Sequence, residues 1–235
     1  MLVTRSGFAP SRERAQALIL AGKVRVAGET VRSPARGVSE DAAIVVDSDP
    51  GYASRGALKL APALDRFGID PGGRVCADIG ASTGGFTDVL LRRGAAKVYA
   101  LDVGRGLLDW RLRQDPRVVV IERVNARDLE SFPEPVSLVV VDVSFISLEK
   151  VLPAVLRAAP AAEFAVLFKP QFEVGRSEVG KGGIVRDQAA VEAALGRFRA
   201  WCVGNGYEVV AETASEVAGA EGNREVFVHL RPERS

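Results

Sequence analysis

The order of apolar and polar residues divides the chain into two parts with different patterns. In the first part, residues 11–21 place apolar side chains at helical spacing, which predicts a short amphipathic helix. A tight turn at Ala27-Gly28 joins segments that alternate like strands. These short strands are expected at residues 23–26, 30–31 and 44–46. So small a set of elements is typical of a binding module rather than an enzyme.

The second part begins with an amphipathic helix predicted over residues 54–67. Apolar runs then alternate with helical patterns, among which helices are predicted at 85–93 and 187–202. Strands are predicted at 75–79, 97–103, 118–122, 138–143, 164–169, 207–213 and 225–231. Continuous apolar runs indicate strands covered on both faces, hence a parallel sheet between helices. The last two strands are close enough in sequence to form an antiparallel pair at the edge.

The expected organisation is therefore a small α+β domain followed by a larger α/β domain. We place the first domain at residues 1–47 and the second at 54–235. Residues 48–53 are the expected linker, because Asp, Ser, Pro and Gly cluster around them.

Composition narrows the possible functions. The chain is 47% hydrophobic and 26% charged, which is typical of a soluble globular protein, and its apolar runs are too short to span a bilayer. No leader pattern is present, so a cytoplasmic protein is expected. Cys76 and Cys202 form no cluster with His229, the single histidine, so no metal site is expected. Both cysteines are predicted to be buried small apolar residues.

Charge is distributed unevenly along the chain. Residues 1–37 hold seven Lys or Arg against two Glu, a net charge of +5, whereas the whole chain carries +1. A basic N-terminal part on a mildly acidic body indicates an anionic partner. A solvated charged face is the alternative.

A glycine-rich turn joins the first predicted strand of the second part to a helix. Its sequence, DIGASTGGFT at 78–87, lets the chain turn sharply and lets a ligand approach the backbone. The spacing is G-x-x-x-G-G rather than the G-x-G-x-x-G of dinucleotide enzymes, which disfavours NAD. Asp102 ends the next strand about 20 residues later, where an acid is the expected acceptor for adenosine ribose hydroxyls.

A second glycine-rich segment at 175–182 is close to a phosphate-binding P-loop. Gly182 stands where that motif needs Ser or Thr for magnesium, and the segment does not follow directly from a strand. We therefore expect a mobile loop with exposed Lys181 and Arg186 that closes over the substrate.

Two long apolar strands each end in a charged residue, Asp142 and Lys169. Open α/β sheets bind ligands at the carboxyl ends of their strands, so both side chains are expected in one crevice beside Gly80 and Asp102. A lone buried charge costs several kcal/mol, so each residue is a candidate partner for the other. A purely structural ion pair is the alternative.

Five segments carry a resemblance to a known family. They are SRGALKL at 54–60, DIGASTGGFT at 78–87, DVSFISL at 142–148, KPQFE at 169–173 and GNRE at 222–225. Together they resemble the TlyA family of ribosomal RNA cytidine 2′-O-methyltransferases, historically labelled haemolysins. The resemblance implies a Rossmann-like class I methyltransferase domain of the FtsJ type. It also implies an RNA-binding S4 domain at residues 1–47.

The resemblance implies a catalytic tetrad of two lysines and two acids. By motif, these residues are Lys59, Asp142, Lys169 and Glu225. Methyl transfer to a ribose hydroxyl needs positioning and a more nucleophilic oxygen. Lys169, desolvated and beside Lys59, would accept or steer the hydroxyl proton, and the two acids would orient the lysines.

S-adenosylmethionine (SAM) is the implied cofactor, and ribosomal RNA or a ribosomal subunit is the implied partner. We expect Gly80, Ala81 and Ser82 at the methionine part, Asp102 at the ribose and Asn125 near the adenine. Phe145 would stack on a ligand or wall the pocket, with core packing as the alternative. The complete cofactor set adds Gly84, Phe86, Thr87, Val103 and Asp142. The RNA-binding candidates are Arg12, Arg14, Lys23, Arg25, Arg32, Arg55, Arg127 and Lys181.

Both ends of the chain resemble the shorter subtype of the family, which implies large-subunit RNA as the substrate. A ribosome-assembly factor with weak or no methyltransferase activity is the main alternative. A small-molecule O-methyltransferase would have little use for a basic N-terminal module. A cytolysin needs an element that inserts into membranes, and the sequence contains none that we recognise.

Overall fold

The computed structural model describes residues 2–5, 12, 15–16, 19, 24–39, 42–46, 51–219 and 222–233. The chain divides into two compact units, Met1–Gly51 and Tyr52–Ser235. Residues 47–50 lie outside the described residues, so the expected linker stays a prediction.

The first unit holds a short helix, α1 (Leu2–Arg5), and a small antiparallel sheet. The sheet has the order β2-β1-β3, from β1 (Val24–Val26), β2 (Glu29–Val31) and β3 (Ile44–Val46). Ala27 and Gly28 both have positive φ, 51° and 84°, as the tight turn between β1 and β2 requires. Of the predicted 11–21 helix, Arg12, Ala15, Gln16 and Ile19 are described, and all four are helical. Ala15 and Ile19 are buried against the sheet residues Val24 and Val31.

The second unit is a seven-stranded sheet between helices, with the order β6-β5-β4-β7-β8-β10-β9. Its parallel strands are β4 (Val75–Ile79), β5 (Lys97–Asp102), β6 (Val118–Glu122), β7 (Leu138–Val141) and β8 (Glu163–Phe168). The last two strands are β9 (Tyr207–Ala214) and β10 (Val226–Pro232). β10 runs antiparallel to both β8 and β9. The predicted mostly parallel sheet with an antiparallel pair at the edge is confirmed.

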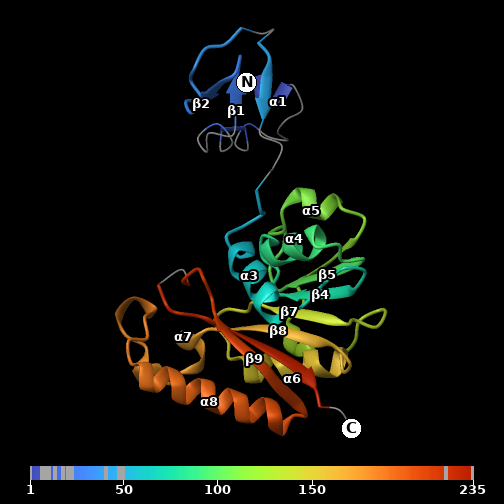
Figure 1. The fold of residues 1–235 in the computed structure, drawn as a ribbon, viewed down its shortest axis with the longest axis vertical. Helices are drawn as coiled ribbons and strands as arrows, with labels where there is room; N and C mark the ends of the chain where they lie inside the picture. Colours follow the sequence, from blue (N-terminus) through green and yellow to red (C-terminus); the bar gives the residue numbers. More distant parts are fainter. Residues whose placement is uncertain are drawn as a thin grey trace. The chain divides into compact units, whose positions relative to one another are not determined.

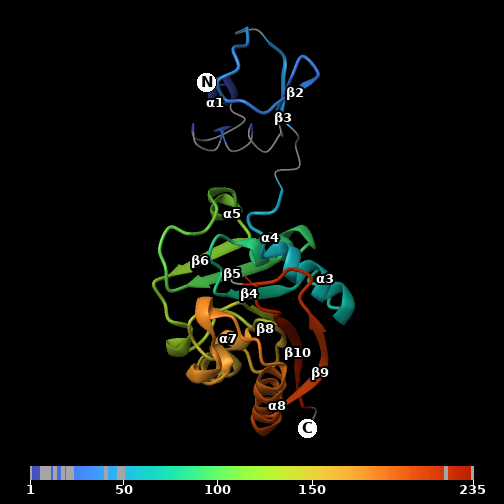
Figure 2. The same ribbon diagram turned by 90° about the vertical axis from the view of Figure 1, so that its left-hand side faces the viewer.

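Helices cover both faces of this sheet, as Figures 1 and 2 show. One face packs against α3 (Ala57–Phe67), α4 (Gly85–Arg92) and α5 (Trp110–Gln114). The other packs against α6 (Leu148–Ala158) and α8 (Gln188–Gly204). Short turns of helix follow the strands at α7 (Pro170–Glu173), η1 (Ala126–Asp128), η2 (Arg176–Glu178) and η3 (Lys181–Gly183). Successive strand residues point to opposite faces, so each strand except the edge strand β9 contributes to both cores.

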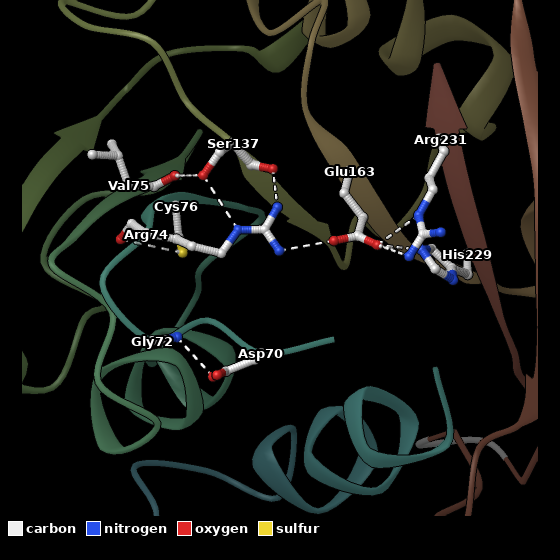
Figure 3. A network of polar contacts seen from close by, with 9 residues as sticks. All are labelled: Asp70, Gly72, Arg74, Val75, Cys76, Ser137, Glu163, His229 and Arg231. Carbon is white, nitrogen blue, oxygen red and sulfur yellow. Dashed lines mark hydrogen bonds and ion pairs between the residues drawn. The ribbon is translucent and has the colours of Figure 1, made fainter. Parts of the chain in front are cut away.

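A polar network closes the amino ends of the strands (Figure 3). Glu163 at the start of β8 accepts hydrogen bonds from Arg74 (2.8 Å) and Arg231 (2.8 Å) and contacts His229 Nε2 (2.7 Å). Burial would raise the pKa of Glu163, but these hydrogen bonds outweigh it and lower the pKa to about 2. The histidine thus lies at the opposite end of β8 from Lys169. Cys76 and Cys202 are free and buried, as predicted.

Candidate active site

The carboxyl ends of the central strands lie level with one another. Ile79 of β4 pairs with Leu101 of β5 and with Val141 of β7. The residues that follow, Gly80, Asp102 and Asp142, therefore lie side by side at one edge. Val226 of β10 pairs with Phe168 of β8, which places Glu225 opposite Lys169 at the same edge. The sheet thus brings predicted residues from five segments together.

The turn after β4 requires glycine at its first position. Gly80 has φ 86°, and a Cβ atom there would lie 2.3 Å from the backbone oxygen of Asp142. Ser82 in the same turn also has positive φ, 48°. Asp102 holds this conformation, because one carboxylate oxygen accepts a hydrogen bond from Ser82 N at 2.8 Å and the other from Gly104 N at 2.7 Å.

Two cavities meet at this turn. The first, which we call cavity A, lies over the ends of β4, β5 and β7 and extends to Asn125 and Leu107. The predicted cofactor residues that line it are Gly80, Ser82, Asp102, Val103, Asn125, Asp142 and Phe145. Its walls are largely apolar, with Leu101, Val143 and Val151 among them, which suits a nucleoside.

The second, cavity B, lies between the start of α3 and the glycine-rich turn. Its lining includes Arg55, Lys59, Ala81 and Phe86, and also Val217 and Ala218, which the sequence did not indicate. Gly80, Ser82 and Asp142 line both cavities. A group bound in cavity A can therefore meet a group bound in cavity B at these three residues.

The four predicted tetrad residues form two ion pairs, and of these residues Asp142 lines both cavities and Lys59 lines cavity B. Lys59 Nζ lies 2.6 Å from Glu225 Oε2, and Lys169 Nζ lies 2.5 Å from Asp142 Oδ1. The side chains are 14% exposed for Lys59, 2% for Glu225, 9% for Lys169 and 21% for Asp142. Burial makes each charge dependent on its partner, and the two pairs together are electrically balanced.

Asp78 lies buried beneath the glycine-rich turn. Burial raises its pKa to about 7, and the nearby charges of Asp142 and Asp102 act in the same direction, against hydrogen bonds from Thr87. Its Oδ2 accepts hydrogen bonds from the backbone N (2.8 Å) and Oγ1 (2.7 Å) of Thr87. Its Oδ1 is buried and has no hydrogen-bond partner among the described residues.

Two predicted cofactor residues line neither cavity. Thr87 is fully buried and is used in holding Asp78. A Cβ at Gly84 would lie 2.3 Å from Leu112, so this glycine lets α4 approach α5. The structure places both residues in the support of the turn.

The loop after β7 carries the predicted Phe145 and also Ser144, which was not predicted; Glu173 of α7, which contacts this loop, was not predicted either. Phe145 has φ 66°, is 90% exposed, and lies 5.3 Å from the ring of Phe172 between centroids, so it is not a core residue. Ser144 beside it lines cavity A and contacts Lys169. Glu173 accepts hydrogen bonds from Ser147 Oγ and Leu148 N, both at 2.8 Å. The signal that could have identified Glu173 is its position in the KPQFE segment, four residues after Lys169.

Most of the candidate RNA-binding cations are exposed. In the first unit Arg12, Arg25 and Arg32 are exposed, whereas Arg14 and Lys23 lie outside the described residues. In the second unit Arg55, Arg127 and Lys181 are exposed. Arg127 lines a third cavity with Lys150, Arg176, Phe145 and Phe172. Lys181 lies in η3, so the expected mobile loop contains short helical turns at 176–178 and 181–183.

Two further observations bear on the remaining function classes. Within the described ranges, no cluster of three or more His, Cys, Asp or Glu is arranged to hold a metal ion. Of the helices that the structure describes, none combines the length and apolar character needed to cross a bilayer.

Comparisons with known proteins agree with this architecture. Residues 52–232 match the family described as FtsJ-like methyltransferase, and residues 1–44 match the S4 domain. The 16S/23S rRNA (cytidine-2′-O)-methyltransferase TlyA of Mycobacterium tuberculosis is 50% identical, over 97% of this chain and 87% of the relative. Hemolysin A of Brachyspira hyodysenteriae is 45% identical over 97% of both chains.

A solved structure shares the fold. A Streptococcus thermophilus protein that carries a hemolysin name matches with a TM-score of 0.76 and 39% identity, over 100% of this chain and 87% of that one. The chain therefore belongs to the TlyA family, and it is a methyltransferase with an FtsJ-like domain and an S4 domain.

Proposed function

We propose that this protein transfers a methyl group from SAM to the ribose 2′-hydroxyl of a cytidine in ribosomal RNA, with large-subunit RNA as its target. The observation that carries the proposal is the two Lys–acid contacts, which include Asp142, where cavities A and B meet, and Lys59, which lines cavity B. The M. tuberculosis relative, whose name includes both 16S and 23S rRNA, supports the substrate class.

Cavity A has the features that a bound SAM would need. Gly80 lets the turn pack directly against Asp142 O, where any side chain would clash, and its backbone lines the cavity. Each oxygen of the Asp102 carboxylate accepts one backbone hydrogen bond and keeps a lone pair for a ribose hydroxyl. Asn125 and Phe145 line the far part of the cavity, where the adenine would lie.

Gly80, Ser82 and Asp102 would hold SAM, which would supply a methyl group on a sulfonium whose sulfur would keep the electron pair of the sulfur–carbon bond. Cavity B would receive the ribose, so its 2′-oxygen would point toward Asp142 and the junction. Lys169 in its neutral form accepts the hydroxyl proton as the new oxygen–carbon bond forms. Asp142 then stabilises the resulting ammonium at 2.5 Å. Glu225 would hold Lys59, which lines cavity B, through their ion pair at 2.6 Å.

RNA would be held mainly through its phosphates. Arg12, Arg25 and Arg32 in the first unit and Arg55, Arg127 and Lys181 in the second are exposed cations that suit this role. A cytidine would have to leave its stack for its 2′-oxygen to reach the junction.

Transfer of labelled methyl groups to ribosomes tests the proposal. Large and small subunits from cells that lack this activity are incubated with the protein and methyl-labelled SAM, and the label is mapped. We expect one 2′-O-methylcytidine in large-subunit RNA. Label confined to small-subunit RNA would overturn the target assignment. A protein that binds SAM and ribosomes but leaves all RNA unlabelled would be an assembly factor instead.

A further inference from the structure

A serine outside the tetrad contacts one of its lysines. Lys169 Nζ lies 2.9 Å from Ser144 Oγ in addition to 2.5 Å from Asp142 Oδ1. Ser144 follows β7 by three residues and lines cavity A. We propose that Ser144 is a positioning residue that holds the Lys169 amine in place in both of its protonation states. The inference rests on the proposed function, in which Lys169 receives the ribose proton.

Burial makes the position of this amine depend on its contacts. The side chain of Lys169 is only 9% exposed, so its ammonium must find hydrogen-bond partners within the protein. A lysine stem has four rotatable carbons, and a single ionic contact leaves Nζ free to swing around its partner. The ion pair with Asp142 and the hydrogen bond to Ser144 come from positions two residues apart on one loop and hold Nζ from two directions. An ammonium has three N–H groups, so it can also donate to the ribose oxygen.

The second lysine lacks this arrangement. Among the contacts of the described residues, Lys59 Nζ has one close side-chain acceptor, Glu225 Oε2 at 2.6 Å. A carboxylate can only accept hydrogen bonds, whereas a hydroxyl both accepts and donates. Ser144 can therefore donate to the neutral Lys169 amine before the proton transfer and accept from the ammonium after it. This difference favours Lys169 over Lys59 as the amine that takes up the ribose proton.

The loop that carries Ser144 is anchored on both sides. Asp142 N donates to Ile79 O at 2.9 Å, which ties the start of the loop to β4. Glu173 accepts hydrogen bonds from Ser147 Oγ and Leu148 N, which ties its end to the helix that follows Lys169. Lys169 and Ser144 thus belong to two segments that are joined at a second point, so their contact is preorganised.

Amine labelling of the full-length protein without ligands tests the contact directly. The acetylation rate of each lysine is measured by peptide mass spectrometry between pH 7 and 10. In Ser144→Ala the ammonium loses an acceptor and the stem gains freedom, so we expect Lys169 to react about threefold faster or more. Lys59 should keep its rate. Ser144→Thr retains the hydroxyl and should behave as the wild type. Ser177→Ala, which removes an exposed hydroxyl in η2, should leave Lys169 labelling unchanged.

Kinetics with SAM and ribosomal RNA give the second readout. We expect Ser144→Ala to lower kcat by about tenfold, the effect of one hydrogen bond to a charged group, with KM for RNA and Kd for SAM within about twofold. Ser144→Thr should restore most of kcat. Unchanged Lys169 labelling in Ser144→Ala would overturn the proposal. A loss of activity that comes from weaker SAM binding rather than from a lower kcat would also overturn it. If the wild type methylates no RNA, the proposed function fails, while the labelling result still decides whether Ser144 holds Lys169.

Discussion

At the scale of single residues, the site concentrates unusual backbone conformations. Ser82 and Phe145 have positive φ, 48° and 66°, although neither is glycine, and both line cavity A with Gly80. Such conformations cost about 1–3 kcal/mol each and persist where the surrounding structure enforces them. Here the amide of Ser82 donates to Asp102, and the loop of Phe145 is held by Glu173. The strained residues Ser82 and Phe145 thus lie on the walls of cavity A, where we expect a ligand to bind.

Gly80→Ala tests the role of this turn. We expect a loss of about 2 kcal/mol or more in the free energy of unfolding, with SAM affinity reduced at least about tenfold, because Cβ would clash with Asp142 O. Gly206→Ala is the control, since Gly206 also has positive φ, 77°, but a Cβ added there would meet no atom within 4 Å. Denaturant unfolding and calorimetric titration measure both effects. Equal losses in the two variants, with SAM affinity retained, would show that the turn is not a binding surface.

At the scale of elements, apolar runs predicted every strand of the second unit to within two residues. Because strand ends follow from these runs, the sequence also predicted that Asp142 and Lys169 share one edge. Helix α6 was not predicted, although Ser147 is a good N-cap and Val151 and Val155 lie on its buried side. Pro153 inside the helix weakens the pattern. The Ser144–Lys169 contact could not be predicted, because it depends on the path of a loop.

Glu173→Gln tests the connection between α6 and α7. Burial raises the pKa of Glu173 to about 7, against hydrogen bonds from Leu148 and Ser147. The folded protein therefore holds this proton more tightly than the unfolded chain, and stability falls as pH rises from about 4.5 to 7. The Gln variant has no group that ionises here, so only the wild type should lose stability as pH rises. We therefore expect the free energy of unfolding of the variant, relative to that of the wild type, to rise by about 2 kcal/mol between pH 5 and 8. Denaturant unfolding at both pH values measures this difference, and a constant difference would contradict a buried charge.

Glu163→Gln tests the network at the opposite ends of the strands. The pKa of Glu163 is lowered to about 2, so its stabilisation is present above about pH 4.5 and is lost as pH falls toward 2. We expect the variant to lose about 2 kcal/mol at pH 7, after allowance for solvent screening, and progressively less toward pH 3. SAM affinity should not change, because β8 separates this network from the site by about 20 Å. Glu208→Gln is the control, because Glu208 is an exposed residue of β9. An equal loss in the free energy of unfolding in this control would refute the role of the network.

At the scale of the whole molecule, the chain joins a basic unit to a methyltransferase unit. The excess charge of the first 37 residues predicted an anionic partner, and Arg12, Arg25 and Arg32 are exposed as that role requires. The family resemblance supplied the kind of anion, since charge alone does not separate RNA from other polyanions. We therefore expect the first unit to contribute to RNA capture and the second unit to carry out catalysis.

The double variant Arg12→Ala/Arg32→Ala tests the role of the basic unit. We expect weaker binding to ribosomal RNA. The slope of log Kd against the logarithm of the salt concentration should also fall by about one to two, because fewer phosphates are neutralised. SAM affinity should stay as in the wild type. Arg36→Ala is the matched control, since Arg36 is already paired with Glu29 at 2.8 Å. An unchanged salt slope in the double variant would exclude these two arginines as phosphate contacts.

The central claim is that the two Lys–acid pairs at the junction of the cavities perform methyl transfer. Single-turnover methylation of ribosomal RNA by Lys169→Ala, with SAM and RNA binding measured on the same protein, tests it most directly. We expect both ligands to bind within about threefold of wild-type affinity while the rate of transfer falls by about 100-fold or more. A Lys169→Ala protein that binds both ligands and transfers methyl groups at the wild-type rate would contradict the account.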